Sequence, residues 1–162
     1  MMSAEEKSKN QPQEEENDFA AMREMVQREK ERLQLLQQIS AAANETDSVE
    51  EAFRIALDLV CEYTKWPLAH VFMPQKEDGA VTLVSSGIWV CDDCEENETF
   101  NFFQEVTAAT TIPPGEGWLG RVFETRKPSW SINVLEEDDF LRNHRLQDLN
   151  VRAGFVFPVL VG

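Results

Sequence analysis

The residues with the most evident chemical potential are two cysteines three positions apart, Cys91 and Cys94. Two thiolates at this spacing can supply half of a tetrahedral zinc site or take part in thiol–disulfide exchange. A zinc site needs two further ligands, and the third cysteine and both histidines lie far away in the sequence. The five carboxylates within residues 91–98 also disfavour a negatively charged thiolate. The sequence therefore predicts an incidental loop with neither a metal nor a disulfide.

A second group, the glycines Gly115, Gly117 and Gly120, matches the spacing of a dinucleotide-binding loop. In that motif a strand precedes the glycines and a helix begins at them, within a parallel sheet. Here Pro113 and Pro114 precede the motif, and no parallel alternation of strands and helices surrounds it. The context therefore disfavours nucleotide binding. It indicates instead a tight turn with positive φ at the first two glycines, and close packing of a helix on a sheet at Gly120.

The bulk charge excludes several classes of partner. The 162 residues include 30 acidic and 15 basic side chains, for a net charge of −15. Such a chain repels nucleic acid and anionic membrane surfaces. No run approaches the roughly 18 uncharged apolar residues of a membrane span, and the N-terminus has no apolar signal segment. We therefore expect a cytoplasmic chain with no nucleic-acid or membrane partner.

The N-terminal 42 residues divide into a tail and a helix. Residues 1–17 have almost no large apolar side chains, which predicts disorder. Residues 18–42 have the 3–4 spacing of a coiled-coil seam, interrupted by Glu29. The apolar seam positions are Phe19, Met22, Val26, Leu33 and Leu36. We expect this helix to form a homodimer, because no globular segment precedes it to cover the stripe. The alternative is a single amphipathic helix on its own domain, with a new inner face from Ile39, Ala42 and Ala43.

Residues 43–162 mix helical and strand patterns in the order typical of an α+β fold around an antiparallel sheet. A capping box at Ser48–Glu51 predicts the start of a helix. Further helices are expected at residues 100–107, 118–124 and 140–149. Strands are expected at residues 68–73, 81–90, 129–134 and 151–161, the first two joined by a hairpin turn at residues 76–79.

One composite pattern is more specific. The segment Ile112–Val122 (IPPGEGWLGRV) is followed by Lys127-Pro128, Ile132-Asn133-Val134, Val151-Arg152-Ala153 and Pro158–Gly162 (PVLVG). This pattern resembles the GAF domain, the ligand-binding sensor module of histidine kinases, response regulators, phosphodiesterases and phytochromes. The likeness covers about residues 35–162. It implies a profilin-like antiparallel sheet flanked by helices, and a further strand and C-terminal helix that this sequence lacks.

The resemblance also implies a ligand pocket between the sheet and its short helices, under the segment 135–150. The pocket candidates are Trp89, Trp118, Phe140, His144, Arg145 and Phe155. His144 and Arg145 would suit an anionic ligand, but exposed helix positions are the default for such residues. Phe155 and Phe157 fit a plain core role better. The resemblance identifies neither the ligand nor any cofactor, and no metal site is expected.

Two classes of family member, one catalytic and one photochemical, need cysteines that this chain lacks. The enzymes that reduce free methionine sulfoxide use cysteines where this chain has Ala109 and Leu119, and no cysteine follows residue 94. Covalent bilin photoreceptors attach their pigment where this chain has Leu141. The resemblance therefore implies neither an enzyme nor a covalent bilin site.

The sequence as a whole predicts a non-catalytic regulatory sensor of a bacterial signal-transduction protein, of the two-component type. It would act as a homodimer joined to a kinase or another output domain, with or without a small-molecule ligand. The main alternative is a structural dimerisation module that binds no ligand.

Overall fold

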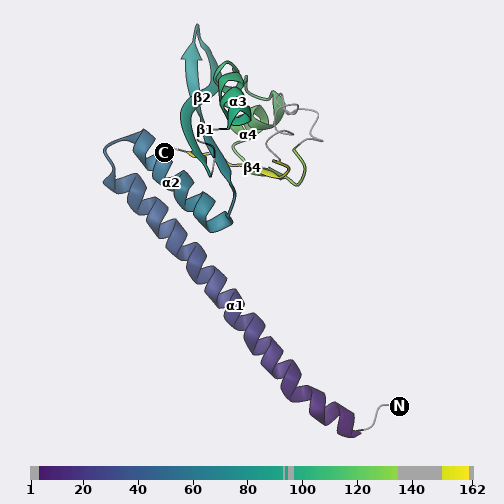
Figure 1. Cartoon of the computed structure of the whole chain (residues 1–162). Helices are drawn as coiled ribbons and strands as arrows, with labels where there is room; N and C mark the ends of the chain where they lie inside the picture. Colours follow the sequence, from purple (N-terminus) through teal and green to yellow (C-terminus); the bar gives the residue numbers. More distant parts are fainter. Residues whose placement is uncertain (1–3, 93, 95–96, 135–150, 161–162) are drawn as a thin grey trace. The chain divides into compact units, whose positions relative to one another are not determined.

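The computed structural model describes residues 4–92, 94, 97–134 and 151–160, with side chains from Glu16 onward. The chain forms two compact units, Met1–Lys65 and Trp66–Gly162. The first is helical, and the second combines helices with antiparallel strands (Figure 1). This composition confirms the predicted α+β fold. None of the helices in the described part of the chain combines the length and the apolar character needed to cross a membrane.

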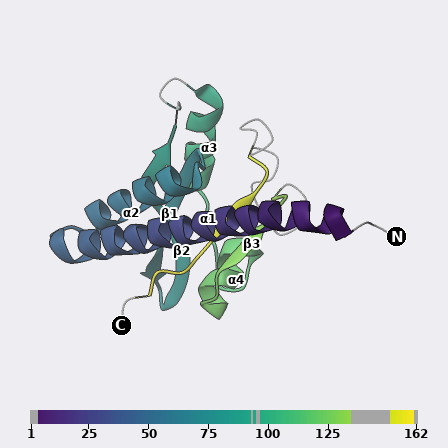
Figure 2. The ribbon, with the colours of Figure 1, turned by 90° about the horizontal axis from the view of Figure 1, so that it is seen from below.

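The first unit is a pair of helices, α1 (Ala4–Glu45) and α2 (Val49–Thr64), which lie side by side (Figures 1 and 2). Ala42 is buried on α1, and Leu35 and Ile39 are half-buried at helical spacing from it. Leu57 and Cys61 are the buried residues of α2. The inner face of α1 thus includes Ile39 and Ala42 as predicted and also Leu35, whereas Ala43 is exposed.

Helix α1 begins at Ala4, within the segment that the sequence predicts to be disordered. The residues concerned are mostly Glu, Lys, Gln and Ala, which have high intrinsic helix propensity. A low apolar content therefore does not by itself end the helix, because the backbone N–H and C=O groups of a helix form hydrogen bonds with one another. The structure thus departs from the expected tail over residues 4–17.

Helix α2 begins at a serine cap, as predicted. The Ser48 hydroxyl oxygen accepts a hydrogen bond from the Glu51 backbone N–H at 3.3 Å. The same hydroxyl donates to the Glu50 carboxylate at 2.9 Å. The pKa of Glu50 is lowered, first by a hydrogen bond from its own backbone N–H and then by the Ser48 hydroxyl. The helix ends at Thr64, and Lys65 caps it with a left-handed φ of 60°.

The second unit starts with a long hairpin of β1 (Leu68–Glu77) and β2 (Ala80–Cys91). The two residues between these strands, Asp78 and Gly79, have φ angles of 48° and 87°. Positive φ at both turn residues matches the right-handed twist of a hairpin, and Asp-Gly is a favoured pair there. The turn confirms the predicted hairpin, and the strands extend beyond the predicted ranges.

The remaining described elements are two helices and two short strands. They are α3 (Glu98–Ala108), α4 (Gly117–Thr125), β3 (Ser129–Ser131) and β4 (Gly154–Val156). Strands β3 and β4 pair antiparallel with each other, apart from the β1–β2 hairpin. The single four-stranded sheet expected from the sequence is therefore two separate ladders among the described residues. The predicted helix at residues 140–149 lies outside the described residues.

The core of the second unit lies between these elements. Phe103, Trp118 and Val134 are buried together, and four half-buried side chains pack against them: Leu68, Trp89, Val151 and Val156. These residues come from β1, β2, α3, α4, β4 and the segments next to β3 and β4. One small cluster therefore holds together elements from most of the unit.

Candidate functional site

The pocket candidate Trp89 lies at the centre of an aromatic cluster. Its indole ring stacks on the imidazole of His70, with ring centroids 3.7 Å apart and planes 11° apart. The edges of Phe100 and Phe103 from α3 meet it at centroid distances of 5.6 and 5.8 Å. The His70 Nε2 atom is also within 2.9 Å of the Ser85 hydroxyl. The cluster thus combines the half-buried Trp89 and His70 rings with two buried phenylalanines, where β2 contacts α3.

A register shift in the hairpin brings His70 and Trp89 opposite each other. The strands pair regularly from the turn to the pair Phe72 and Ser85. Beyond that pair the register shifts, and the next pair is His70 with Trp89. The shift occurs at Gly87, whose φ is 74°. The Ser85 hydroxyl accepts from the Gly87 N–H at 3.2 Å, which satisfies part of the irregular backbone. Sequence reasoning considered His70 only as a metal ligand and missed this partnership.

Trp118 is a core residue. Only 5% of its surface is exposed, and its indole N–H donates to the Ser129 hydroxyl at 2.8 Å. A Cβ atom at Gly154 would lie 2.8 Å from the Trp118 ring and from Val134, so β4 approaches the indole as closely as a residue without a side chain allows. The sequence placed Trp118 at a pocket rim, whereas the structure buries it. A role in ligand binding stays a prediction for this residue.

The other pocket candidates fall into two groups. Phe155 is 47% exposed and stacks on Phe157, with ring centroids 5.5 Å apart. The preferred interpretation of these two residues as plain core was therefore wrong. Both side chains are exposed, that of Phe155 on β4 and that of Phe157 just after the strand. Phe140, His144 and Arg145 lie outside the described residues.

The described residues on either side of the range 135–150 contact each other. The Val134 backbone N–H donates to the Arg152 carbonyl oxygen. Val134 is almost fully buried, and Val151 packs on the same core cluster. Val134 and Val151 therefore both lie at the core cluster that contains Trp118.

The glycine-rich segment is a structural turn. Gly115 and Gly117 have φ angles of 81° and 60°, as predicted. Backbone hydrogen bonds in both directions join Ile112 to Leu83 of β2, at 2.8 and 2.9 Å. The Gly115 N–H donates to the Gly120 carbonyl at 2.9 Å, which folds the turn back on α4. Gly120 packs on this turn, whereas the sequence predicted that it packs on a sheet. The segment therefore joins α4 to the hairpin.

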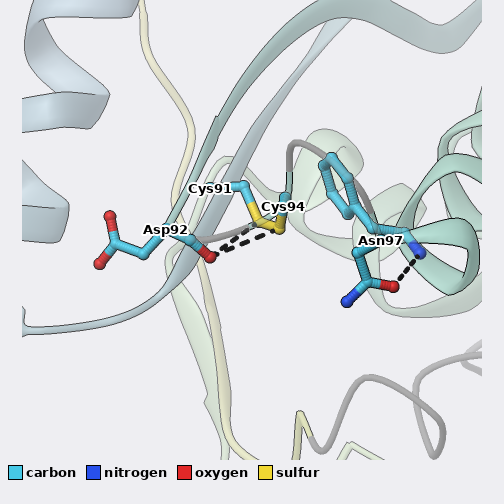
Figure 3. The surroundings of a disulfide bond; sticks show 5 residues. Cys91, Asp92, Cys94 and Asn97 are labelled. Carbon is cyan, nitrogen blue, oxygen red and sulfur yellow. Dashed lines mark hydrogen bonds between the residues drawn. A yellow bond between two sulfur atoms is a disulfide. The ribbon is translucent and has the colours of Figure 1, made fainter.

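The two loop cysteines form a disulfide (Figure 3). Their Cα atoms are 5.8 Å apart, within the usual range for disulfides. The prediction of two separate thiols was therefore wrong. It rested on the charge of the loop, whereas the separation of the two Cα atoms decides whether a disulfide can form. Among the described residues, no group of three or more His, Cys, Asp and Glu side chains is placed to hold a metal ion.

The predicted dimer seam forms an exposed stripe on α1. Between 51% and 65% of the surface of each side chain is exposed for Phe19, Met22, Val26, Leu33 and Leu36. Glu29, the charged residue within this stripe, lies 3.5 Å from the Arg32 guanidinium of the same helix. Leu35 and Ile39 are half-buried and Ala42 is buried, so the less exposed face of α1 is not the one that carries the stripe.

A comparison with protein-family models identifies the family of this chain, and a solved structure shares its fold. The GAF domain model matches residues 46–162. The crystal structure of the A. aeolicus Nlh2 GAF domain in an inactive state is similar in fold. It is 18% identical, with a TM-score of 0.56 over 83% of this chain and 74% of that one. No curated protein matches this sequence. The family match spans the glycine-rich turn, the hairpin and the short strands described above, and this chain belongs to the GAF domain family, whose members are regulatory sensor modules.

Proposed function

We propose that this chain is a non-catalytic regulatory sensor module of a bacterial signal-transduction protein of the two-component type, acting as a homodimer. The observation that carries the proposal is the exposed apolar stripe of α1, in a chain that belongs to the GAF family. Burying one large apolar side chain stabilises an assembly by roughly 1.5 kcal/mol or more, so five of them favour pairing with a second copy.

The charges along α1 are compatible with such pairing. The Glu29 carboxylate has Arg32 beside it at 3.5 Å, and Arg28 lies 3.5 Å from Glu24. A lone carboxylate in a seam would repel its counterpart, whereas a carboxylate with a neighbouring guanidinium does so less. In this proposal, occupancy of the GAF unit biases the packing of the paired helices, which carry the signal to a kinase or another output domain.

The similar A. aeolicus domain was solved in an inactive state, a description that suits a module with two functional states. We extend that idea to this chain as part of the proposal. The ligand would be a small molecule held near the half-buried Trp89 and His70 rings. Its chemical identity is left open.

A second candidate function is a structural dimerisation module without a ligand. The buried position of Trp118 favours it, because an indole packed against Phe103 and Val134 fills space that a ligand would otherwise need. This candidate shares the homodimer and differs only in whether the GAF unit holds a molecule.

Native mass spectrometry of the purified full chain tests both parts of the proposal at once. We expect twice the 18.6 kDa chain mass, with a retained small molecule that is released on activation in the gas phase. A dimer without additional mass, which also shows no thermal shift with a panel of metabolites, would favour the structural module. A monomer at micromolar concentration would contradict the homodimer in both versions.

A further inference from the structure

The Cys91–Cys94 disulfide closes a very short loop, and this limits what it can do. The two cysteines are three positions apart in the chain. A disulfide stabilises a protein largely by constraining its unfolded chain, and that constraint grows with the length of the closed loop. A bond across so few residues adds little to global stability. Its effect is therefore concentrated in the local structure that it holds.

That local structure is the connection from β2 to α3. The Asp92 N–H donates to the Pro67 carbonyl at 2.9 Å, which ties the loop to the residue before β1. The Asn97 N–H donates to the Cys94 carbonyl at 3.2 Å. The Asn97 side chain in turn caps α3 by accepting from the Phe100 N–H at 3.0 Å (Figure 3). Cys94 is therefore hydrogen-bonded to Asn97, the residue that caps α3.

The same connection joins two aromatic residues that touch. Trp89 lies two residues before Cys91 on β2, and Phe100 lies in the first turn of α3. Their ring centroids are 5.6 Å apart, and Phe103 contacts the same indole one turn further along the helix. The disulfide thus crosslinks the chain between the strand that carries Trp89 and the helix that packs on it.

We propose that Cys91 and Cys94 are a reversible dithiol–disulfide site. Reduction would free the first turn of α3 and loosen the packing of Phe100 and Phe103 on Trp89. The reaction partner is a dithiol. Its thiolate attacks one sulfur, the Cys91–Cys94 bond breaks, and a mixed disulfide forms. The second thiol of the reagent then displaces the protein sulfur. The reagent leaves as a disulfide, and each cysteine has gained one electron and one proton.

The surroundings of the sulfur atoms suit both states. Both cysteines are half-buried rather than enclosed, so a reagent can reach them. The Asp92 carbonyl oxygen lies 3.7 Å from the Cys91 Sγ and 3.6 Å from the Cys94 Sγ (Figure 3). It can therefore accept a weak hydrogen bond from either S–H group after reduction. The five acidic residues among residues 91–98 repel anionic thiols and so favour an uncharged dithiol.

The test uses the full chain in mixtures of reduced and oxidised dithiothreitol. Alkylation followed by mass spectrometry counts the free thiols, and amide hydrogen exchange follows each helix. We expect Cys91 and Cys94 to become alkylatable together and reversibly. Reduction should speed amide exchange in α3 several-fold and leave α4 unchanged. It should also change a tryptophan fluorescence signal that a Trp89→Phe variant lacks.

The controls use the third cysteine and the pair itself. A Cys61→Ser variant should respond as the natural chain does, because Cys61 lies on α2 of the other unit. A double variant, Cys91→Ser with Cys94→Ser, should exchange at the faster rate in every mixture. Two results overturn the proposal: both thiols staying alkylatable in the most oxidising mixture, or a disulfide that forms without changing amide exchange in α3. Neither result bears on dimerisation through α1.

Discussion

Gly120 of α4 lies against the carbonyl oxygen of Pro113 so closely that a Cβ atom on Gly120 would collide with it. The colliding atom belongs to the backbone and cannot rotate away as the end of a flexible side chain can. The same turn is bonded to α4 through Gly115 and to the hairpin through Ile112. Gly120, the third glycine of the motif, therefore determines how closely α4 approaches the glycine-rich turn. That turn also connects α4 to the hairpin.

Replacing this glycine tests that relationship. In an ordinary helix Gly→Ala is favourable by about 1 kcal/mol. Here we expect Gly120→Ala to lower the free energy of unfolding by about 2 kcal/mol or more, because overpacking against fixed backbone is costly. Urea denaturation followed by circular dichroism measures it. The control is Gly79→Ala, which has a φ of 87° and nothing within 4 Å. It should cost about 1 kcal/mol from backbone strain alone. A Gly120→Ala variant as stable as the natural chain would show that the close approach is not required.

The hydrogen bond of Trp118 gives a second prediction. Trp118→Phe keeps an aromatic ring in the core but removes the N–H that donates to Ser129. We expect a loss of about 1–2 kcal/mol in the free energy of unfolding. The matched change Trp130→Phe alters a side chain that is 69% exposed and should stay within about 0.5 kcal/mol of the natural chain. Equal effects of the two changes would mean that the buried hydrogen bond contributes nothing measurable.

The cap of α2 gives a prediction about pH. Because the pKa of Glu50 is lowered in the folded chain, its contribution to stability is present above the unfolded pKa and is lost as pH falls through the folded one. An NMR titration of the Glu50 carboxyl should show a midpoint below the usual range for glutamate. In a Ser48→Ala variant the pKa should rise toward that range, and helix stability should fall by about 1 kcal/mol. An unchanged midpoint in the variant would exclude the Ser48 hydroxyl as a cause.

The parts of the fold that the sequence predicted are those governed by local rules. The Asp78-Gly79 turn, the Ser48 cap and the positive φ angles at Gly115 and Gly117 each follow from a residue type at a fixed place in the chain. The glycine-rich segment also carried the likeness to the GAF family, which the family match over residues 46–162 confirms.

The site was harder to predict because it depends on register and on distant contacts. Counting outward from the turn, regular pairing would place His70 opposite Gly87, and only the shift in the ladder places it opposite Trp89. The Ser85-Ser86-Gly87 run is the signal that could have indicated an irregular strand. The burial of Trp118 depends on Val134 and Gly154, which are distant in sequence. The cysteine pair was misjudged because charge was weighed and backbone geometry was not.

We propose that α1 joins two copies of the chain through its exposed stripe, and the molar mass in solution is the decisive test. Light scattering should be measured across a concentration series for the natural chain, for Leu33→Asp combined with Leu36→Asp, and for the control Gln34→Asp. Gln34 is exposed and lies between the two leucines in sequence but outside the stripe. We predict a mass near twice 18.6 kDa for the natural chain and the control, and a shift toward 18.6 kDa for the double variant. A natural chain that stays monomeric, or a double variant that dimerises as well as the control, would contradict the claim.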